Sequence, residues 1–574
     1  MKLSLSKYDL LLLITLILAL FATVFNSYHL PLGFDLYHNL IVACILSIGL
    51  TACFLLRFKE IKIPYSIITW MLLLGLIIIQ PLIHNIAYSD YLIFPIGTLI
   101  LIIILAIAIA NIDDKKAFLN NYLMIFVGFM VLTVVIQLLQ LRGYNAAYND
   151  LVIFPAAISS RLDANFSQPN QAAFMLVLAQ LACLYFYNLN KKKLWLTFGS
   201  LFIVGLALTS SRGGLILGLA SIVLFNAFYN QPLVYKVRHS VLQLFGFLTA
   251  YLIGIFFIKN FEVLDKVSNS AIERFSKGSL DARLTLQDQA WLMFQENPLT
   301  GYGWGGFAKG SIDYATELNS FIFSKHSHFF LSQIASELGI IGLLCLIPIT
   351  IFIVKKMSFK MDVFNAVCFT AISIIVLYSC SEFPLWFLRF LIIFIIFITL
   401  TDSKFICVHS CYSKVFTILA LGSSVIILLY ISSYLKIFNN IKYLAINDLT
   451  GDGIQEVYND TPDVFGMSAF KESILFHYIP IDSNAIEGKL AIAKRVTAVS
   501  ITQRGLFKYA RLLALNKESH KSIAMFKAAC AFNWKGDCDG VIKELEVIAK
   551  AEPQVYGIIK YEIDQWKVSF NPNI

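Results

Sequence analysis

Two histidines and an arginine are the residues of this chain whose types and spacing best suit catalysis. Arg283 opens a polar stretch, residues 283–307, in an otherwise apolar sequence, and His326 and His328 lie where the chain turns apolar again. Histidine is the usual general base near neutral pH, and a positioned base contributes ~10²- to 10⁴-fold to a rate. The guanidinium group of arginine matches phosphate oxygens in a bidentate arrangement. These residues therefore suit proton abstraction beside a bound phosphate group.

Further polar residues are expected at the same membrane face. Arg161 precedes Gln168 and Asn170, and Arg212 lies in a short turn between two apolar runs. An arginine on the outer face runs against the usual enrichment of Lys and Arg on the inner face, so it is expected to have a specific use. We expect Arg212 and Arg283 to clamp a diphosphate whose lipid tail stays in the bilayer. They would also neutralise the charge that builds on the leaving group.

The histidine pair leaves two interpretations open. His326 and His328 are two residues apart, so on a helix their side chains would point in different directions and only one would face a given pocket. Alternatively, both are interfacial side chains. Solitary arginines such as Arg142 and Arg389 fit the pattern of interfacial anchors, whose charged heads reach toward water.

The composition indicates the elements that must hold these residues. The chain has 574 residues, of which 58% are hydrophobic and 14% charged, which is too apolar for a soluble protein of this length. The first apolar run follows Lys2 and Lys7 without a small-residue cleavage site, so it reads as an uncleaved first helix with a cytoplasmic N-terminus. The net charge of +9 comes from Lys and Arg in short loops, a topology signal that does not indicate nucleic-acid binding.

The fold class predicted from these features is an all-α polytopic membrane protein. Apolar runs of roughly 20 residues predict about thirteen transmembrane helices. They lie near residues 8–25, 37–56, 64–83, 92–111, 120–142, 170–188, 194–210, 213–229, 240–258, 329–354, 362–380, 384–401 and 414–433. The spacing of Gly214 and Gly218 predicts a close approach of another helix.

Basic loops alternate along the chain with loops that are nearly free of Lys. This alternation puts the loop 259–327 and the whole tail after Leu435 on the outer face. The predicted domains are 1–258 (N-terminal transmembrane helices), 259–327 (outer catalytic loop), 328–435 (C-terminal transmembrane helices) and 436–574 (outer helical domain).

The tail has ordinary polarity and a helical pattern. Apolar residues at i, i+3 and i+4 within residues 506–532 and 540–553 predict paired amphipathic helices that resemble tetratricopeptide-type hairpins. Such a domain suits docking of a partner protein. Cys530 and Cys538 could form a disulfide in an oxidising compartment or stay as two unpaired thiols, and both interpretations are open.

Metal-dependent chemistry has no support in the sequence. There is no His-Glu-x-x-His motif and no Asp-x-Asp cluster in an outer loop. Residues 448–456 lack the ligand spacing of a calcium loop, and residues 407–411 offer only three zinc ligands.

Five sequence pieces in one order resemble a known superfamily. They are SQPNQAA (167–173), SSRGG (210–214), Arg283 followed by NPLTGYGWGGF (297–307), HSHFFLSQIASELGIIG (326–342) and SEFPLWFLRFL (381–391). Together they resemble the O-antigen ligase and polymerase superfamily of bacterial glycan-transferring membrane proteins. The QPN and EFPLW pieces and the helical tail are most similar to its pilin-type protein O-oligosaccharyltransferases.

The resemblance implies en bloc transfer of a preassembled oligosaccharide. The donor would be undecaprenyl diphosphate, a membrane lipid, and the acceptor a Ser or Thr hydroxyl of an exported protein such as a pilin. No metal, cofactor or nucleotide sugar is implied. The protein would lie in the bacterial inner membrane, with its active site and tail facing the periplasm.

The resemblance also implies roles for individual residues. His328 matches the family's loop histidine that activates the acceptor hydroxyl, and Arg212 and Arg283 match its diphosphate-binding arginines. Gln168 and Asn170 match a pocket-lining pair. The family usually has Asn after this histidine, whereas this chain has Phe329. Either this polar neighbour is not essential, or another group such as Ser327 or His326 orients the imidazole instead.

Two alternative functions are less consistent with the sequence. An oligosaccharide polymerase or lipid A ligase would use a sugar hydroxyl as acceptor, and it would not need a protein-docking tail. A flippase or other transporter of lipid-linked glycans would carry polar residues in mid-membrane, whereas the predicted helices are apolar at their centres.

Overall fold

The computed structural model describes residues 5–26, 35–57, 60–141, 161–166, 168–260, 280–318, 324–447, 452–531 and 538–569. By its internal contacts the chain groups into two compact units. The first unit comprises Met1–Met71, Gly97–Gly278 and Ile347–Ile431, and the second comprises Leu72–Ile96, Ser279–Leu346 and Ser432–Ile574. The four-part division predicted from the sequence stays a prediction.

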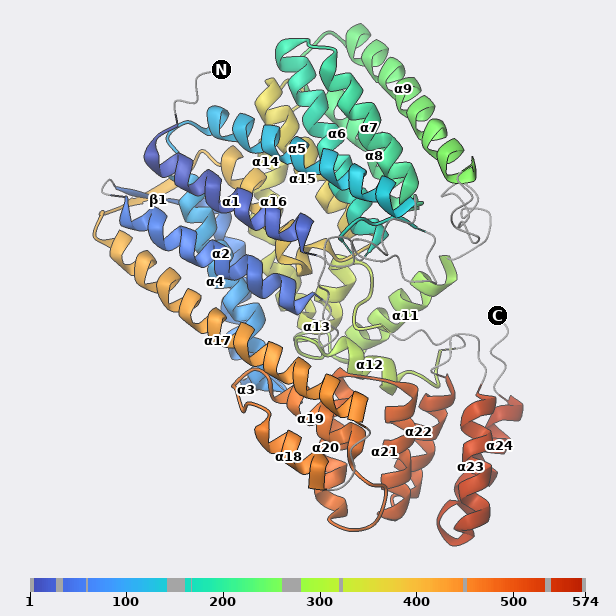
Figure 1. Ribbon diagram of the computed structural model, residues 1–574. Helices are drawn as coiled ribbons and strands as arrows, with labels where there is room; N and C mark the ends of the chain where they lie inside the picture. The colour runs from blue at the N-terminus through green and yellow to red at the C-terminus, as the bar shows by residue number, and fades with distance from the viewer. Residues whose placement is uncertain are drawn as a thin grey trace. The chain divides into compact units, whose positions relative to one another are not determined.

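Apolar helices make up most of the first unit (Figure 1). They are α1 (Lys7–Phe25), α2 (Leu36–Leu55), α5 (Lys115–Leu141), α6 (Pro169–Asn190), α7 (Leu194–Leu208), α8 (Arg212–Phe228), α9 (Leu233–Asn260), α14 (Ile347–Lys356), α15 (Val363–Ser379) and α16 (Leu388–Thr401). Three helices continue from one unit into the other, namely α3 (Ile68–Ile83), α4 (Ile93–Ala110) and α17 (Tyr412–Asn447). A short antiparallel pair joins β1 (Ile61–Pro64) to β2 (Phe405–Val408), with Ile61 opposite Val408.

Helix α6 is the central element of the first unit. It packs against α5, α7, α8 and α15, and its residues 171–186 are all buried. Small residues permit this packing, since a Cβ added at Gly214 would lie 2.7 Å from Cβ of Ala173. A Cβ at Gly218 would lie 2.7 Å from the Phe247 ring. The close helix approach predicted at these two glycines is confirmed.

Each of the thirteen predicted helices corresponds to an apolar helix in the structure. By length and composition, eight helices of the described chain are able to cross a membrane, or nine if the bent pair α13 (Phe330–Cys345) and α14 counts as one span. Helices α7, α8, α15 and α16 are apolar but shorter. The predicted all-α polytopic membrane fold is confirmed.

Two of the predicted helices, which follow His328 and Glu382, are interrupted or start later in the structure. The run 329–354 is broken, because Gly339 has φ 63° and ψ −159° inside α13 and α14 begins separately at Ile347. The run 384–401 begins as the 3₁₀ turn η4 (Pro384–Trp386), and α16 starts only at Leu388.

The second unit joins the polar segment to the C-terminal tail. Its helices include α11 (Leu280–Glu296), α12 (Phe307–Asp313), α13 and the tail helices α18 (Asp452–Asp460), α19 (Ser468–Tyr478), α20 (Ile486–Val499), α21 (Gln503–Leu515), α22 (Ser519–Ala531), α23 (Asp539–Ala551) and α24 (Pro553–Ser569). Ala308 and Ala315 share one hydrophobic core with Leu506, Phe507 and Phe526 of the tail. The tail and the polar segment therefore stabilise each other.

Successive tail helices pack against their neighbours, from α19 through α24 (Figure 1). This arrangement agrees with the helical pairs predicted from the sequence. Cys530 and Cys538 are both buried, and Cys530 Sγ lies 3.9 Å from the Cys538 carbonyl oxygen. A disulfide between them stays a prediction.

The loop after α3 also holds the tail. The Tyr88 hydroxyl donates to Glu472 at 2.6 Å, and Arg495 forms two hydrogen bonds with the same carboxylate. Asp90 accepts hydrogen bonds from the backbone N–H and the hydroxyl of Ser468. Polar contacts from a connecting loop thus fix the first tail helices within the second unit.

Candidate functional site

Helix α11 is fastened to the turn that carries the two histidines. The Gln287 side chain donates a hydrogen bond to the Ser327 carbonyl oxygen at 2.5 Å. Arg283 lies four residues before Gln287, and residues at this spacing share a helix face. Arg283 is therefore on the side of α11 that faces the histidine turn. Arg283 and His328, which lie 45 positions apart in the sequence, are therefore on two segments of the second unit that this hydrogen bond connects.

Ser327 lies between the two histidines, and its backbone and its hydroxyl group are both hydrogen-bonded. Its backbone N–H donates to the Gln333 side chain at 2.6 Å, and its hydroxyl donates to the Phe329 carbonyl and accepts from Ser332. The residue is fully buried. Because the Ser327 hydroxyl is engaged with the backbone and with Ser332, the geometry does not favour it as the group that orients the imidazole.

The backbone at His328 is strained. Its φ of 58° places it in the left-handed region, which is uncommon for residues other than glycine. Strain of this kind persists only where the surroundings hold it, and it concentrates at functional sites. The contacts to Ser327 supply such surroundings.

The different directions expected of His326 and His328 on a helix are not observed. They precede α13, which begins at Phe330, so helical geometry does not apply to them. Their rings meet edge to face with centroids 4.2 Å apart. Ser324 Oγ lies 3.4 Å from His326 Nδ1. The His326 side chain thus lies beside the His328 imidazole.

Burial and the neighbouring His328 lower the pKa of His326 to about 2. His326 is therefore neutral at physiological pH.

The break in α13 accommodates the loop after α11. The backbone N–H groups of Ile340 and Ile341 donate to the carbonyl oxygens of Pro298 and Leu299. Tyr302 N–H donates to the Ser336 carbonyl oxygen at 2.9 Å. The loop thus satisfies backbone groups that the interrupted helix leaves without an intrahelical partner.

Glu337 holds the glycine-rich part of the same loop. Its Oε1 accepts a hydrogen bond from Phe307 N–H at 3.1 Å, and its carbonyl oxygen accepts from Gly303 N–H at 2.9 Å. Gly301 has φ 66°, and a Cβ there would lie 2.3 Å from the carbonyl carbon of Glu337. The NPLTGYGWGGF and SELGIIG pieces are therefore complementary halves of one packing motif.

Two tyrosines tie the end of α11 to this loop. The hydroxyl groups of Tyr302 and Tyr314 both donate to the Glu296 carboxylate, and they lie 3.0 Å from each other. These hydrogen bonds lower the pKa of Glu296. The C-terminal end of α11 is consequently fixed relative to α12.

A second polar cluster lies in the first unit, around Asn170. Its side-chain oxygen accepts hydrogen bonds from Arg161 at 2.9 Å and from the Ser211 hydroxyl at 2.8 Å. Its side-chain nitrogen donates to Glu382 at 2.8 Å. Arg161 also donates to the Thr209 carbonyl oxygen. The QPN, SSRGG and SEFPLW pieces are therefore assembled at one place.

Helix N-termini meet in this cluster. Gln168 caps α6 by accepting from Gln171 N–H, and Ser211 caps α8 by accepting from Gly214 N–H. Arg212 is the first residue of α8. Helix N-termini and arginines both favour anions, and in this cluster they lie together with the buried carboxylate of Glu382.

The segment that bears Arg161 is held by two glutamines of α5. Gln140 exchanges two hydrogen bonds with the backbone of Ala164, and Gln137 donates to the Leu162 carbonyl oxygen. Ala164 has φ 51°. Both glutamines are fully buried.

Arg389 is not an interfacial anchor, and that prediction is wrong. Its guanidinium lies 2.6 Å from Asp35 Oδ2, both side chains are at most 5% exposed, and it also donates to Gln171. The residue is an internal tie that holds α16 to the start of α6. Arg142 lies outside the described residues.

The predicted site residues thus fall into two groups. Arg161, Gln168, Asn170 and Arg212 belong to the first unit, and Arg283, His326 and His328 belong to the second. The sequence reasoning missed Glu382, Gln287, Gln333 and Glu337. For Gln333 and Glu337 the signal was an amide and a carboxylate inside the apolar run that follows His328, whereas Gln287 lies in a polar stretch that gives no such signal.

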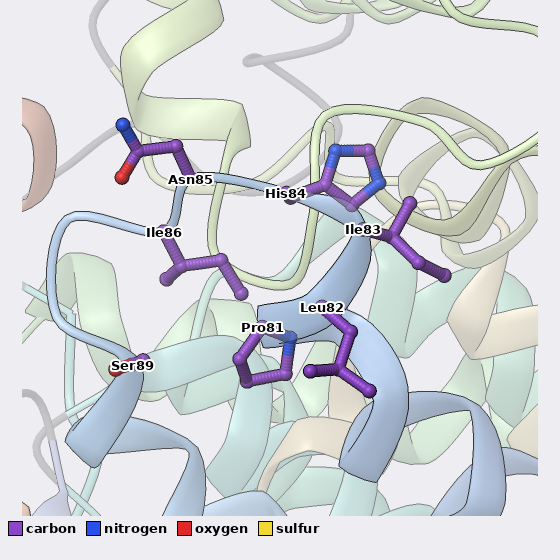
Figure 2. Close-up of a pocket in the computed structure, with 7 residues that line it drawn as sticks. All are labelled: Pro81, Leu82, Ile83, His84, Asn85, Ile86 and Ser89. Atoms are coloured by element: carbon purple, nitrogen blue, oxygen red, sulfur yellow. The ribbon is translucent and has the colours of Figure 1, made fainter.

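A pocket of about 410 Å³ lies where α3 ends (Figure 2). It is lined by Pro81, Leu82, Ile83, His84, Asn85, Ile86 and Ser89. His84 Nε2 lies 3.2 Å from the Thr300 carbonyl oxygen. None of the residues predicted from the sequence lines this pocket. Across the described ranges, no group of three or more His, Cys, Asp or Glu side chains is arranged to hold a metal ion.

Comparison with known proteins covers part of the chain. Residues 197–347 match the family model of the O-antigen ligases, a range that includes Arg212, Arg283 and His328. A general O-oligosaccharyltransferase of Acinetobacter baylyi is 28% identical over 204 residues. That alignment covers 33% of this chain and 34% of the relative, about a third of its length. Both findings confirm the predicted resemblance of this chain to the O-antigen ligase superfamily.

Proposed function

We propose that this protein is a glycan-transferring membrane enzyme, a protein O-oligosaccharyltransferase. It moves a preassembled oligosaccharide en bloc from undecaprenyl diphosphate to a Ser or Thr hydroxyl of an exported protein such as a pilin. The match to the O-antigen ligase family and the similarity to a general O-oligosaccharyltransferase support the reaction class.

One observation carries the proposal. The hydrogen bond between Gln287 and Ser327 associates the Arg283 face of α11 with the His328 turn. A cation that binds a diphosphate and a base that accepts a proton are the two groups that this transfer needs. The strained backbone of His328 is further support, because strain concentrates at functional sites.

The proposed reaction needs no cofactor. The acceptor hydroxyl gives its proton to the His328 imidazole as its oxygen bonds to the anomeric carbon of the donor's first sugar. The bond from that carbon to the diphosphate oxygen breaks, and its electron pair leaves with undecaprenyl diphosphate. Arg283 and Arg212 stabilise the negative charge on that leaving group.

The remaining residues assist these steps. His326 contacts the His328 ring and orients it. Arg161 and Asn170 hold the turn before Arg212 through Thr209 and Ser211. Gln168 caps the helix that carries Asn170, and this group lines the binding site of the donor.

We further propose an inner-membrane location with the catalytic segment and the tail in the periplasm. The positive-inside distribution of Lys and Arg supports this orientation. The tail helices would dock the acceptor protein. This role is supported by the core that the tail helices share with α12, within the unit that contains His328.

An O-antigen ligase that acts on a sugar hydroxyl is the second candidate. It is favoured by the description of the family that matches residues 197–347. The chemistry at the donor would be the same, and only the acceptor would differ.

Reconstitution distinguishes the two candidates. Purified protein in liposomes receives an undecaprenyl-diphosphate oligosaccharide and either a pilin or a lipid A–core acceptor. Intact-mass analysis is expected to show the pilin heavier by one whole oligosaccharide, with no change for the H328A variant. Transfer only to lipid A–core would establish the second candidate, and no transfer to either acceptor would reject both.

A further inference from the structure

We propose that Gln333, Glu337 and Gln287 are positioning residues that set the backbone conformation of His328. We call the chain of contacts from Phe307 through Glu337 and Gln333 to Ser327 the α13 relay. The inference rests on the proposed function, in which His328 is the general base.

The relay ends on the residue next to His328. Gln333 accepts from the Ser327 N–H at 2.6 Å, and Gln287 donates to the Ser327 carbonyl at 2.5 Å. Both peptide polar groups of Ser327 are therefore occupied by side chains of two different helices. The Ser327 carbonyl belongs to the peptide bond that precedes His328, so the Gln287 bond fixes the peptide plane on one side of the φ torsion of His328. The Gln333 bond fixes the peptide plane before it.

The strain at His328 explains why such restraint is needed. A non-glycine residue with φ of 58° is less stable than the same residue in a common conformation. Without the two hydrogen bonds the chain would relax toward negative φ. The imidazole would then move away from its present position beside the His326 ring.

The relay extends from Gln333 to the glycine-rich loop. Glu337 lies one helical turn after Gln333, and the two side chains interact. Glu337 Oε1 accepts from Phe307 N–H at 3.1 Å. The loop that fills the break in α13 is thus connected to the histidine turn through two side chains of that helix.

The residue types also require an explanation. Gln333 and Glu337 are 3% and 2% exposed, in a helix that is otherwise mainly apolar. Burying an amide and a carboxylate is costly unless hydrogen bonds compensate. Apolar residues would satisfy packing at both positions, but they could not hold Ser327 or Phe307.

The central test exchanges the two side chains. In the Q333E/E337Q protein, Glu at 333 can accept from Ser327 N–H. Gln at 337 can accept from Phe307 N–H and donate back to residue 333. In the single variant Q333E, two carboxylates face each other in a buried site, which is unfavourable. The variant Q333L removes the acceptor for Ser327 altogether. S336A is the matched control, because the Ser336 hydroxyl is buried on the same helix and donates only to the Gln333 carbonyl.

Two readouts are measured on each variant in detergent. The first is glycan transfer, with kcat and the KM for the donor determined separately. Misplacing a catalytic group by about 1 Å can cost ~10²-fold, so Q333L and Q333E are expected to lose kcat on that order with KM nearly unchanged. The second is the rate at which diethyl pyrocarbonate modifies His328, determined by peptide mass spectrometry.

We expect kcat to fall and the His328 modification rate to change in Q333L and Q333E. Both quantities should return toward the wild-type values in Q333E/E337Q and stay unchanged in S336A. A folded Q333L with normal kcat and a normal His328 modification rate would overturn the inference. If Q333L does not fold, Q333E/E337Q is compared with Q333E. A kcat and a His328 modification rate no closer to the wild-type values in Q333E/E337Q than in Q333E would also overturn the inference.

Failure of the proposed function gives a different result. The wild type would then transfer no glycan to any acceptor, while the His328 modification rates would still separate Q333L from S336A. The inference that the relay positions His328 would then be supported, and the role of His328 as the general base would be rejected.

Discussion

Gly339 lies directly against the backbone of Leu299. A Cβ at Gly339 would be 2.3 Å from the carbonyl carbon and the carbonyl oxygen of Leu299, and its φ is 63°. The contact closes the packing between the NPLTG loop and the broken helix α13. It links the NPLTGYGWGGF and HSHFFLSQIASELGIIG pieces through backbone atoms that cannot move aside.

Replacing Gly339 is expected to lower the stability of the protein strongly. G339A combines a backbone clash with a left-handed conformation, and each costs about 1–3 kcal/mol. We expect a markedly lower unfolding temperature in detergent and loss of transfer. G128A is the control, since no atom lies within 4 Å of a Cβ there. A G339A protein as stable as G128A would contradict the packing described.

H328A is expected to lose glycan transfer by ~10²- to 10⁴-fold, because it removes the proposed base. The protein should insert and unfold like the wild type, since His328 precedes α13 and is only partly buried. Intact-mass analysis of the acceptor and thermal unfolding measure the two properties. Near-normal glycosylation would exclude His328 as the base.

R283K is expected to be nearly inactive. A lysine retains the charge, but it cannot reproduce the two parallel hydrogen bonds of a guanidinium to a phosphate. Transfer is measured across donor concentrations, alongside R212K. High activity of R283K, lost on adding salt, would show that the residue only attracts the donor.

Acidification is expected to destabilise the histidine turn. The pKa of His326 is about 2 in the folded protein and ~6.5 in an unfolded chain. Between these values the unfolded chain binds the extra proton, so stability falls as pH falls below ~6.5. Thermal unfolding between pH 7.5 and 5 is compared for wild type and H326F, which should lose part of this dependence. An unchanged pH dependence in H326F would show that His326 does not contribute to it.

Truncation after about residue 440 is expected to abolish transfer to every acceptor. The tail supplies Leu506, Phe507 and Phe526 to the core that contains Ala308 and Ala315. Its loss would expose that core and loosen the loop held by Glu337. Intact-mass comparison of exported proteins with and without the tail tests this. If sugar acceptors were still modified while proteins were not, the tail would be a docking domain alone.

The sequence by itself determined the all-α polytopic fold, because burial in lipid requires long apolar helices whose periodicity and length are local properties. It also identified Arg212, Arg283 and His328 as candidates, since outer-face arginines run against the positive-inside distribution and histidine is the usual general base. The motif order was enough to predict the resemblance.

Only the tertiary structure decided how these residues are held. The contacts of Gln287 with Ser327 and of Asn170 with Glu382 join residues 40 and 212 positions apart, and no local pattern encodes such pairings. Tertiary packing also decides three other features. They are the helix break at Gly339, the contact between the two histidine rings and the buried salt bridge between Arg389 and Asp35. Each depends on which surfaces pack together, because buried polar groups find partners only after the chain has folded.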